Sequence, residues 1–354
     1  MVTASVRIAG LSVLLLVGCK PNLDQTVSII ESPIVLAVRS DPPEGAPASP
    51  VQFTALYVDD TGPVVQAPLD WAFCSARDPL ANLGPVNPMC LEKAGTWLAP
   101  LGVGVQVHGK LPDDGCRQFG PDVPEPLPGQ PPGRPVDPDS TGGYYQPVRY
   151  LAPGNTGVYV GIAETRLSCN LAGAFGGEAV SFAKRYHGNA NPNAASLELS
   201  LDDDASAASV LPSAADGGVT NIVPLGAHVS LRVGWTACPL QDACGDHVCG
   251  PDETVQSCPS DCGNPTGCTG AERFAAFDLG SQSVVDRREA MAIAWFATAG
   301  TFDHDRTGRE ATDATNTSDN GWRAPAQPSL VHLWVVLRDD RGGVGWGEYR
   351  LDVR

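Results

Sequence analysis

Short runs in which apolar and polar residues alternate recur along this 354-residue chain. Residues 51–57, 229–235 and 331–337 show the pattern most clearly. A period of two is typical of β-strands with one buried face. The last of these runs is followed by Asp339-Asp340-Arg341-Gly342-Gly343, a turn that predicts a hairpin onto a final strand over 344–353. Further strands are predicted at 33–38, 69–74, 157–163, 178–182, 197–201 and 292–296. The sequence therefore predicts an all-β protein.

The composition is that of a folded chain with many turns. Apolar residues make up 42%, which is enough to build a core, and the 39 Gly and 32 Pro stay below the share found in low-complexity chains. At roughly 150 residues per domain, the length predicts two domains. A turn-rich segment from Arg185 to Asn193 is the best boundary. Eight prolines within residues 121–138 predict an exposed Pro-rich loop, 120–139, inside the first domain.

The N-terminus explains the odd count of 11 cysteines. Arg7 is the only charge among the first 19 residues, and the apolar run 8–17 is too short to span a bilayer. The run ends in Leu16-Val17-Gly18-Cys19, which resembles the bacterial lipobox. That resemblance implies a signal peptide over 1–18 and lipidation of Cys19, followed by a tether over 19–32. Lys20 implies sorting to the outer membrane. The alternative is an ordinary secretory signal, with Cys19 as a stray thiol.

Ten cysteines remain after Cys19 is set aside, enough for five disulfides, and they place the chain in an oxidising compartment. Cys74 and Cys90 are expected to close a local loop, which leaves Cys116 and Cys169 to bridge the Pro-rich loop. The other six crowd into 31 residues, a segment too short to bury a core without disulfides. We expect this segment, 238–268, to be an insertion in the second domain, closed at its base by Cys238 and Cys268. The pairing of the inner four stays open. These four are Cys244, Cys249, Cys258 and Cys262.

The inner part of the insertion has the pattern Cys-Gly-Asp-x-x-Cys, followed by Cys-Pro-x-Asp-Cys. It resembles cysteine-rich repeats of secreted bacterial proteins and, in size and acidity, the calcium-binding Lin-12/Notch repeat. Carboxylate oxygens are ligands that calcium prefers, so a structural calcium ion is one hypothesis. Its candidate ligands are Asp246, Asp252, Glu253 and Asp261. The plainest alternative is a knot held by disulfides alone, with solvated acids. A third hypothesis is zinc bound by cysteines and His247, which the irregular spacing disfavours.

The C-terminal segment 285–354 carries a family resemblance. It contains Trp295-Phe296-Ala297-Thr298-Ala299-Gly300, then Trp322-Arg323-Ala324-Pro325, then the closing hairpin. This order resembles the immunoglobulin-like and PKD-like domains of bacterial surface proteins. The first domain shares the strand order and Trp71, but it lacks the Trp-x-Ala-Pro segment. The resemblance implies two antiparallel Ig-like β-sandwiches in tandem, over 33–189 and 190–354, in a surface lipoprotein of Gram-negative, myxobacterial type.

Charge and motifs narrow the function classes. With 40 acidic against 23 basic residues, the net charge of −17 disfavours nucleic acid and anionic lipid surfaces as partners. The sequence has no Gly-x-Ser-x-Gly and no His-Glu-x-x-His motif. His304 between two aspartates is expected to lie in a solvated turn, and His332 alone on the outer face of a strand. We therefore expect a non-enzymatic, lipid-anchored envelope protein with a structural or protein-interaction role.

A cluster of tyrosines supports the main alternative. Tyr144, Tyr145 and Tyr150 lie outside the predicted strands. They are expected to form either a small core beneath the Pro-rich loop or a surface that stacks on a sugar. The alternative function is therefore a surface lipoprotein that binds carbohydrate or another ligand. A secreted hydrolase is a third hypothesis, which no catalytic motif supports. The expected partners are the membrane, through the lipid, and envelope proteins or glycans.

Overall fold

The computed structural model describes residues 27–78, 86–120, 143–169, 171, 176–201, 208–214, 221–239, 244–245, 253–262, 267–278 and 280–354. Within these ranges the all-β prediction is confirmed, because strands make up most of the regular structure and form several antiparallel sheets. The predicted signal peptide, Cys19 and residues 121–139 of the Pro-rich loop lie outside the described residues. No helix among the described residues is long and apolar enough to cross a membrane.

The first sandwich consists of two sheets that enclose one apolar core, built around Phe53, Trp71 and Val148. One sheet contains β1 (Ile34–Asp41), β3 (Pro50–Asp59), β4 (Gly62–Pro63) and β7 (Gln106–Lys110). The other contains, in order, β2 (Glu44–Gly45), β9 (Gly157–Ser168), β8 (Gly143–Gly154), β5 (Asp70–Cys74) and β6 (Leu98–Val103). Two short helices, η1 (Pro88–Leu91) and α1 (Gly115–Phe119), lie in its connections.

The second sandwich has the same construction, with a core built around Leu231, Trp295 and Val335. One sheet contains, in order, β11 (Ser209–Val210), β10 (Ala194–Leu201), β13 (His228–Trp235), β19 (Thr317–Arg323) and β17 (Thr301–Phe302). The other contains, in order, β12 (Asn221–Val223), β21 (Val344–Val353), β20 (Ser329–Asp339), β16 (Met291–Ala297) and β18 (Arg306–Arg309).

Both sandwiches have the strand order of an immunoglobulin fold. In each, a short strand pairs in parallel with the last strand, β2 with β9 and β12 with β21. The third strand of the immunoglobulin order carries a buried tryptophan in antibody domains. Trp71 in β5 and Trp295 in β16 occupy this position, and both side chains are fully buried. Trp71 packs between Phe53 and Tyr150, with ring centroids 6.2 and 5.5 Å away, where antibody domains have a disulfide between sheets.

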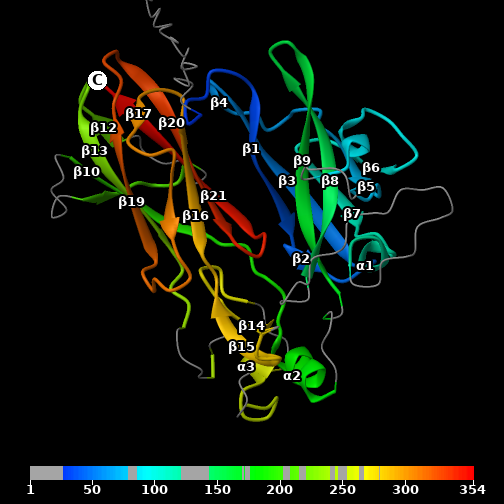
Figure 1. Cartoon of the computed structure of the whole chain (residues 1–354). Coiled ribbons are helices and arrows are strands. Elements are labelled where there is room, and N and C mark those ends of the chain that lie inside the picture. The colour runs from blue at the N-terminus through cyan, green and yellow to red at the C-terminus, as the bar shows by residue number, and fades with distance from the viewer. Residues whose placement is uncertain are drawn as a thin grey trace, which may run out of the picture.

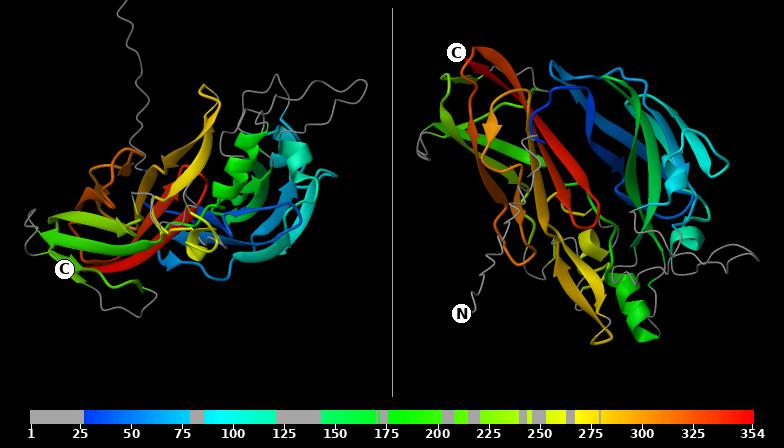
Figure 2. Two further views of the ribbon diagram at one scale, coloured as in Figure 1. Left: turned by 90° about the horizontal axis from the view of Figure 1, so that it is seen from below. Right: turned by 45° about the horizontal axis from the view of Figure 1, so that its top comes forward.

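The two sandwiches pack face to face, so four sheets are stacked in one body (Figures 1 and 2). The sheet of β1 and β3 covers the outer face of the sheet of β16 and β20. Arg338 reinforces this contact, because its Nη2 donates a hydrogen bond to the carbonyl of Leu36 across the interface (2.9 Å). The apolar side chains buried between the sandwiches are Ile30, Leu36, Ala37, Leu56, Val58, Ala294, Trp334 and Val336.

His332 is not isolated, in contrast to the prediction. It lies on the outer face of β20 as expected, but the first sandwich covers that face, so His332 is only 7% exposed. Its ring stacks on Trp334 at a centroid distance of 5.8 Å. The turn after β3 approaches so closely that a Cβ at Gly62 would come within 2.8 Å of His332 Cε1. The run Leu333–Leu337 is continuously apolar, which is typical of a strand buried on both faces.

Residues 178–182 form a helix, α2 (Gly177–Arg185), and the predicted strand there is wrong. Glu178 in the first turn and Lys184 and Arg185 in the last turn complement the helix dipole. The helix also has a partner for its apolar side, because Phe182 is buried and stacks on Tyr186 at 4.9 Å. A helix of nine residues is marginal by itself, so packing rather than local propensity selects it.

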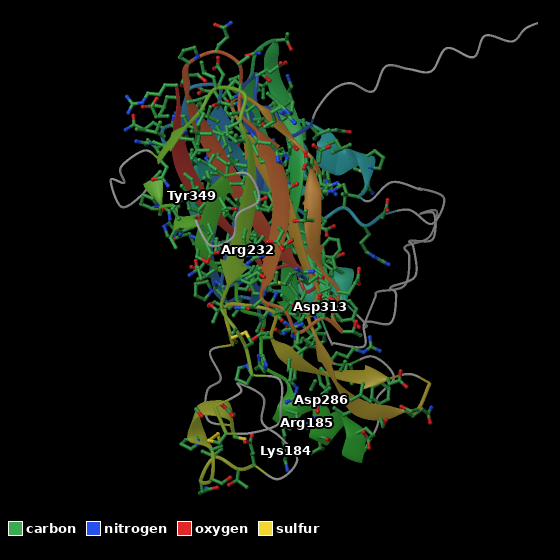
Figure 3. The ribbon with its side chains drawn as sticks, turned by 90° about the vertical axis from the view of Figure 1, so that its left-hand side faces the viewer. Lys184, Arg185, Arg232, Asp286, Asp313 and Tyr349 are labelled. Atoms are coloured by element: carbon green, nitrogen blue, oxygen red, sulfur yellow. A yellow bond between two sulfur atoms is a disulfide. The ribbon has the colours of Figure 1, made fainter. Side chains whose placement is uncertain are left out.

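The sequence suggested that the chain returns to the second sandwich near Arg273, but it does not return there. Residues 273–288 form a separate hairpin of β14 (Arg273–Asp278) and β15 (Ser283–Arg288). This hairpin and α2 lie together below the sandwiches (Figures 1 and 3). Arg185 of α2 forms an ion pair with Asp286 of β15. The insertion between β13 and β16 therefore contains both the cysteine-rich segment and the hairpin.

The N-terminal segment is attached to the second sandwich before it enters the first. Ile29 pairs with Ala297 at the end of β16. Ile30 N donates a hydrogen bond to Ala297 O (2.9 Å), and Ala297 N donates one to Ser28 O (2.9 Å). Ile30 is buried between the sandwiches. The tether predicted over 19–32 therefore ends by Ser28, because the residues after it belong to the folded body.

Candidate functional site

Eight of the described cysteines are joined in four disulfides, Cys74–Cys90, Cys116–Cys169, Cys238–Cys268 and Cys244–Cys258. Three of these are the pairs that the sequence suggested, and the fourth resolves part of the inner pairing. Cys262 is also disulfide-bonded, and Cys249 lies outside the described residues. Disulfides in this number indicate a compartment outside the cytoplasm.

Of the four predicted calcium ligands, Asp246 and Asp252 lie outside the described residues. The structure brings the other two together, because the ligand atoms of Glu253 and Asp261 lie within 4.8 Å of each other. Asp261 is 1% exposed, near the end of α3 (Pro259–Cys262), and its Oδ2 accepts a hydrogen bond from Gly245 N (2.6 Å). Two carboxylates at this spacing fit a calcium ion, and calcium binding stays a prediction.

Zinc fits this segment poorly. The Sγ atoms of Cys244 and Cys258 lie beside the two carboxylates, but they are bonded to each other. A disulfide sulfur is not a thiolate, and zinc requires the thiolate. These two cysteines are therefore not zinc ligands.

The three tyrosines do not form one aromatic surface. All three lie in β8, which corrects the prediction that they lie outside the strands. Alternate residues of a strand point to opposite faces, so Tyr144 and Tyr150 are buried on the core side while Tyr145 points away from it. Tyr144 and Tyr145 therefore cannot stack together on one sugar.

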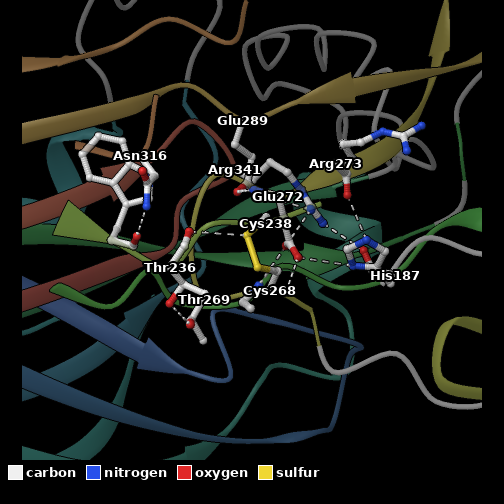
Figure 4. The surroundings of a disulfide bond; sticks show 12 residues. His187, Thr236, Cys238, Cys268, Thr269, Glu272, Arg273, Glu289, Asn316 and Arg341 are labelled. Carbon is white, nitrogen blue, oxygen red and sulfur yellow. Dashed lines mark hydrogen bonds and ion pairs between the residues drawn. A yellow bond between two sulfur atoms is a disulfide. The ribbon is translucent and has the colours of Figure 1, made fainter. Parts of the chain in front are cut away.

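A cluster of buried charges lies where the two sandwiches meet the insertion (Figure 4). We call it the Arg341 cluster. Its members are Glu44, Arg166, Glu272, Glu289, Asp339 and Arg341, each no more than 8% exposed. Arg341 lies in the turn between β20 and β21, and its Nη1 is 3.1 Å from Glu272 Oε1 and 3.4 Å from Glu289 Oε1. The cluster thus places charged groups of both sandwiches and of the insertion in contact inside the protein.

The other nitrogen of Arg341 reaches the first sandwich and the linker. Its Nη2 is 3.4 Å from Glu44 Oε2 and donates to the Tyr186 hydroxyl (3.1 Å) and the His187 carbonyl (2.9 Å). Arg166 of β9 forms a second ion pair with Glu44, with Nε 3.1 Å from Oε2. The first sandwich, the linker, the insertion and the second sandwich are therefore joined through one guanidinium group.

Backbone groups of the linker and the knot complete the cluster. Asn189 N donates to Glu44 Oε2 (3.1 Å), and Ala190 N donates to Glu272 Oε1 (3.2 Å). Cys268 N donates to Glu272 Oε2 (2.7 Å), so the disulfide that closes the knot lies directly beside the cluster. The segment predicted as a domain boundary is therefore a buried joint with fixed hydrogen bonds.

The cluster has more carboxylates than guanidinium groups. Burial raises the pKa of Glu272 to about 7 although Arg341 attracts the charged form. Burial and the nearby Asp339 and Glu272 raise the pKa of Glu289 well above its usual range. Glu44 differs, because two arginines and the hydroxyls of Tyr186 and Ser168 together outweigh burial and lower its pKa. The protein therefore holds protons in this cluster that the unfolded chain would release at neutral pH.

These shifts predict a pH dependence of stability. Between about pH 4.5 and 7 the folded state binds more protons than the unfolded chain, so the free energy of unfolding falls as pH rises through this window. We expect a loss of roughly 2–3 kcal/mol between pH 5 and pH 8, measured by denaturant titration. The lowered pKa of Glu44 acts in the opposite direction, but only at more acidic pH.

The variant Glu272→Gln is the matched control for this pH effect. It keeps the size of the side chain but cannot ionise, so the decline from pH 5 to pH 8 should become shallower. An unchanged slope in this variant, or a wild-type protein whose stability is flat or rises over this range, would show that the cluster does not store protons.

A cavity of about 500 Å³ adjoins the Arg341 cluster. Its walls come from all three parts of the molecule: Tyr145 and Arg166 from the first sandwich, Phe274 from the hairpin, and Arg341 from the second sandwich. Guanidinium groups lie over aromatic rings here, with Arg341 Cζ 4.7 Å from the Phe274 ring and Arg166 Cζ 5.7 Å from the Tyr145 ring. A cavity of this size is large enough for a small-molecule ligand.

Sequence reasoning missed both the Arg341 cluster and the cavity. It treated Asp339–Gly343 as a hairpin turn, which it is, but a turn motif does not show that its arginine is buried. Glu272 and Glu289 flank the hairpin at β14 and β15, and only the position of that hairpin brings them together. One usable signal was the linker sequence from Tyr186 to Asn191, whose His and Asn side chains suit a buried polar joint.

No protein-family model matches the chain, and no curated protein matches it. Among solved structures, the chain is similar to the Yersinia pseudotuberculosis adhesin InvE, with 9% identity over 92% of this chain and 61% of that chain and a TM-score of 0.19. It is also similar to latent PorU from Porphyromonas gingivalis, with 9% identity over 91% of this chain and 34% of that chain and a TM-score of 0.17. These similarities to bacterial β-rich proteins are weak, and the chain spans less than two thirds of each.

Proposed function

We propose that this protein is a non-enzymatic, lipid-anchored protein of the bacterial cell envelope with a structural or protein-interaction role. The observation that carries the proposal is the attachment of Ser28–Ile30 to β16. Both sandwiches and the insertion form one packed body, and its first fixed residue follows closely on the predicted anchor. A lipid on Cys19 would thus hold a rigid body rather than a string of separate modules.

The length of the tether orients this body. Nine residues lead from Cys19 to Ser28, and a chain of that length spans at most about 30 Å. The end of the body near Ala297 would therefore lie close to the membrane. The hairpin β14–β15, α2 and the cysteine-rich segment are at the opposite end (Figure 1) and would point away from it. This orientation presents the insertion to partners in the envelope.

Exposed aliphatic residues at the anchored end agree with this orientation. Val27, Val158, Ile222 and Leu330 are each more than half exposed. They lie at the start of the described chain, at the β8–β9 turn, in β12 and at the start of β20, which Figure 1 shows at the same end as the C-terminus. Such side chains are compatible with a lipid surface, whereas the acidic net charge disfavours electrostatic attachment.

The variant Cys19→Ala tests the anchor. We expect wild-type protein to incorporate labelled palmitate and to fractionate with the outer membrane, and we expect the variant to lose both properties. Lys20→Asp is the matched control: it should keep the lipid label, while its membrane fraction shifts toward the inner membrane. Continued labelling of Cys19→Ala would contradict the proposal.

A further inference from the structure

The cavity beside the Arg341 cluster lies at the end of the second sandwich where two connections meet. One is the turn between β20 and β21, which contributes Asp340 and Arg341, and the other is the insertion between β13 and β16, which contributes the hairpin. In immunoglobulin variable domains, connections at one end of the sandwich form the binding surface. Loops held by a rigid scaffold are where binding residues concentrate.

The walls of the cavity are rich in arginine although the chain as a whole is acidic. Four guanidinium groups line it, those of Arg166, Arg287, Arg288 and Arg341, against two carboxylates, Asp286 and Asp340. Asp286 is already paired with Arg185 and Arg273, neither of which lines the cavity. Arg166 and Arg341 are themselves paired with carboxylates of the Arg341 cluster, so the positive charge that these walls offer a ligand comes from Arg287 and Arg288.

Donors at these walls remain available. The Nε–H groups of Arg288 and Arg341 are buried and have no hydrogen-bond partner among the described residues. Arg288 Nη1 is held by the carbonyl of Asp313 (2.5 Å), which fixes the direction of the side chain. Arg287 is about half exposed, and its nearest carboxylate, Asp278, is 3.9 Å away. The exposed guanidinium group of Arg287 is therefore the donor that a ligand in the cavity can reach directly, and the charge of Arg288 lies beside it.

We propose that this cavity binds a small carboxylate-bearing ligand of about monosaccharide size, with Arg287 and Arg288 as the groups that recognise the carboxylate. Guanidinium groups bind carboxylates through paired N–H donors, and Phe274 and Tyr145 offer apolar surface to the body of the ligand. The volume of about 500 Å³ is large enough for such a molecule. This inference goes beyond the envelope role proposed above and is independent of the lipid anchor.

Calorimetry with the folded protein tests the proposal, using D-glucuronate, D-glucose and inorganic phosphate as probes. We expect saturable binding of glucuronate, at least tenfold weaker binding of glucose, and no preference for phosphate over glucuronate. Arg287→Ala should weaken glucuronate binding at least tenfold, because it removes a charged donor from an otherwise intact wall. Arg288→Lys keeps the charge but removes the planar guanidinium group, and should weaken binding several-fold.

Arg350→Ala is the matched control, because Arg350 is 43% exposed on the last strand and does not line the cavity. It should bind glucuronate like the wild type, and all variants should unfold at the same denaturant concentration. The proposal is overturned if glucuronate does not bind, if glucose binds equally well, or if phosphate binds and glucuronate does not. Equal weakening by Arg287→Ala and Arg350→Ala would also overturn it, since only the net charge would then matter.

Discussion

Arg341→Ala should lower the free energy of unfolding at pH 7 by about 3–5 kcal/mol, the usual cost of removing one partner from a buried ion pair. The guanidinium group of Arg341 contacts the carboxylates of Glu44, Glu272 and Glu289, and all four side chains are buried. After the substitution, these carboxylates would lie together without that positive charge. Denaturant titration followed by tryptophan fluorescence measures the loss.

Two comparisons separate this effect from a general loss of charge. Arg350→Ala removes an exposed arginine whose nearest carboxylate, Glu348, is 4.0 Å away, and should change stability by no more than about 0.5 kcal/mol. Lower pH should shrink the deficit of Arg341→Ala, because the uncompensated carboxylates take up protons. A loss below about 1 kcal/mol, or a deficit that grows toward pH 5, would contradict the role assigned to Arg341.

Trp334→Ala should be about equally damaging, at roughly 3–5 kcal/mol, the range for deletion of a buried aromatic side chain. Trp334 is fully buried, and it lies between the sandwiches rather than inside either of them. The substitution leaves a cavity against Leu56 and Val58, and neither rigid sheet can collapse into it. The free energy of unfolding and the radius of gyration should both be measured, because loss of the interface separates the sandwiches.

Leu330→Ala provides the matched control on the same face of the same strand. Leu330 is 55% exposed, four residues before Trp334, so its truncation should cost no more than about 0.5 kcal/mol. If Trp334→Ala is as mild as Leu330→Ala, the first sandwich does not cover β20 in solution.

The sequence predicted the fold class because strand periodicity is a local property. Alternation over 51–57, 229–235 and 331–337 marked three of the central strands, and Trp71 and Trp295 marked the same position in both sandwiches. The disulfides Cys74–Cys90, Cys116–Cys169 and Cys238–Cys268 followed from sequence distance and from counting. Strand periodicity depends only on neighbouring residues, and the cysteines that were paired left few possible pairings.

The packing of the two sandwiches, the helix α2 and the Arg341 cluster depend on contacts between distant segments. A single sequence does not show which distant segments meet. The sequence placed Val331, Leu333 and Leu337 on one face of β20, but it did not indicate that β1 and β3 would cover the other face. The helix α2 contacts the hairpin, a distant segment, because Glu178 Oε2 accepts a hydrogen bond from Val284 N (3.0 Å) and Arg185 forms an ion pair with Asp286. The Arg341 cluster requires both sandwiches, the linker and the insertion to be in place at once.

We expect the two sandwiches and the insertion to unfold as one unit, held together at the Arg341 cluster and at the Trp334 interface. Hydrogen exchange resolved by segment tests it most directly, through the opening free energies of β8 in the first sandwich and β20 in the second. We predict that the slowest amides of both strands open with the same free energy, and that Arg341→Ala lowers both by the same amount. Different opening free energies in the wild type, or a loss confined to β20, would contradict the claim and indicate two sandwiches that unfold independently.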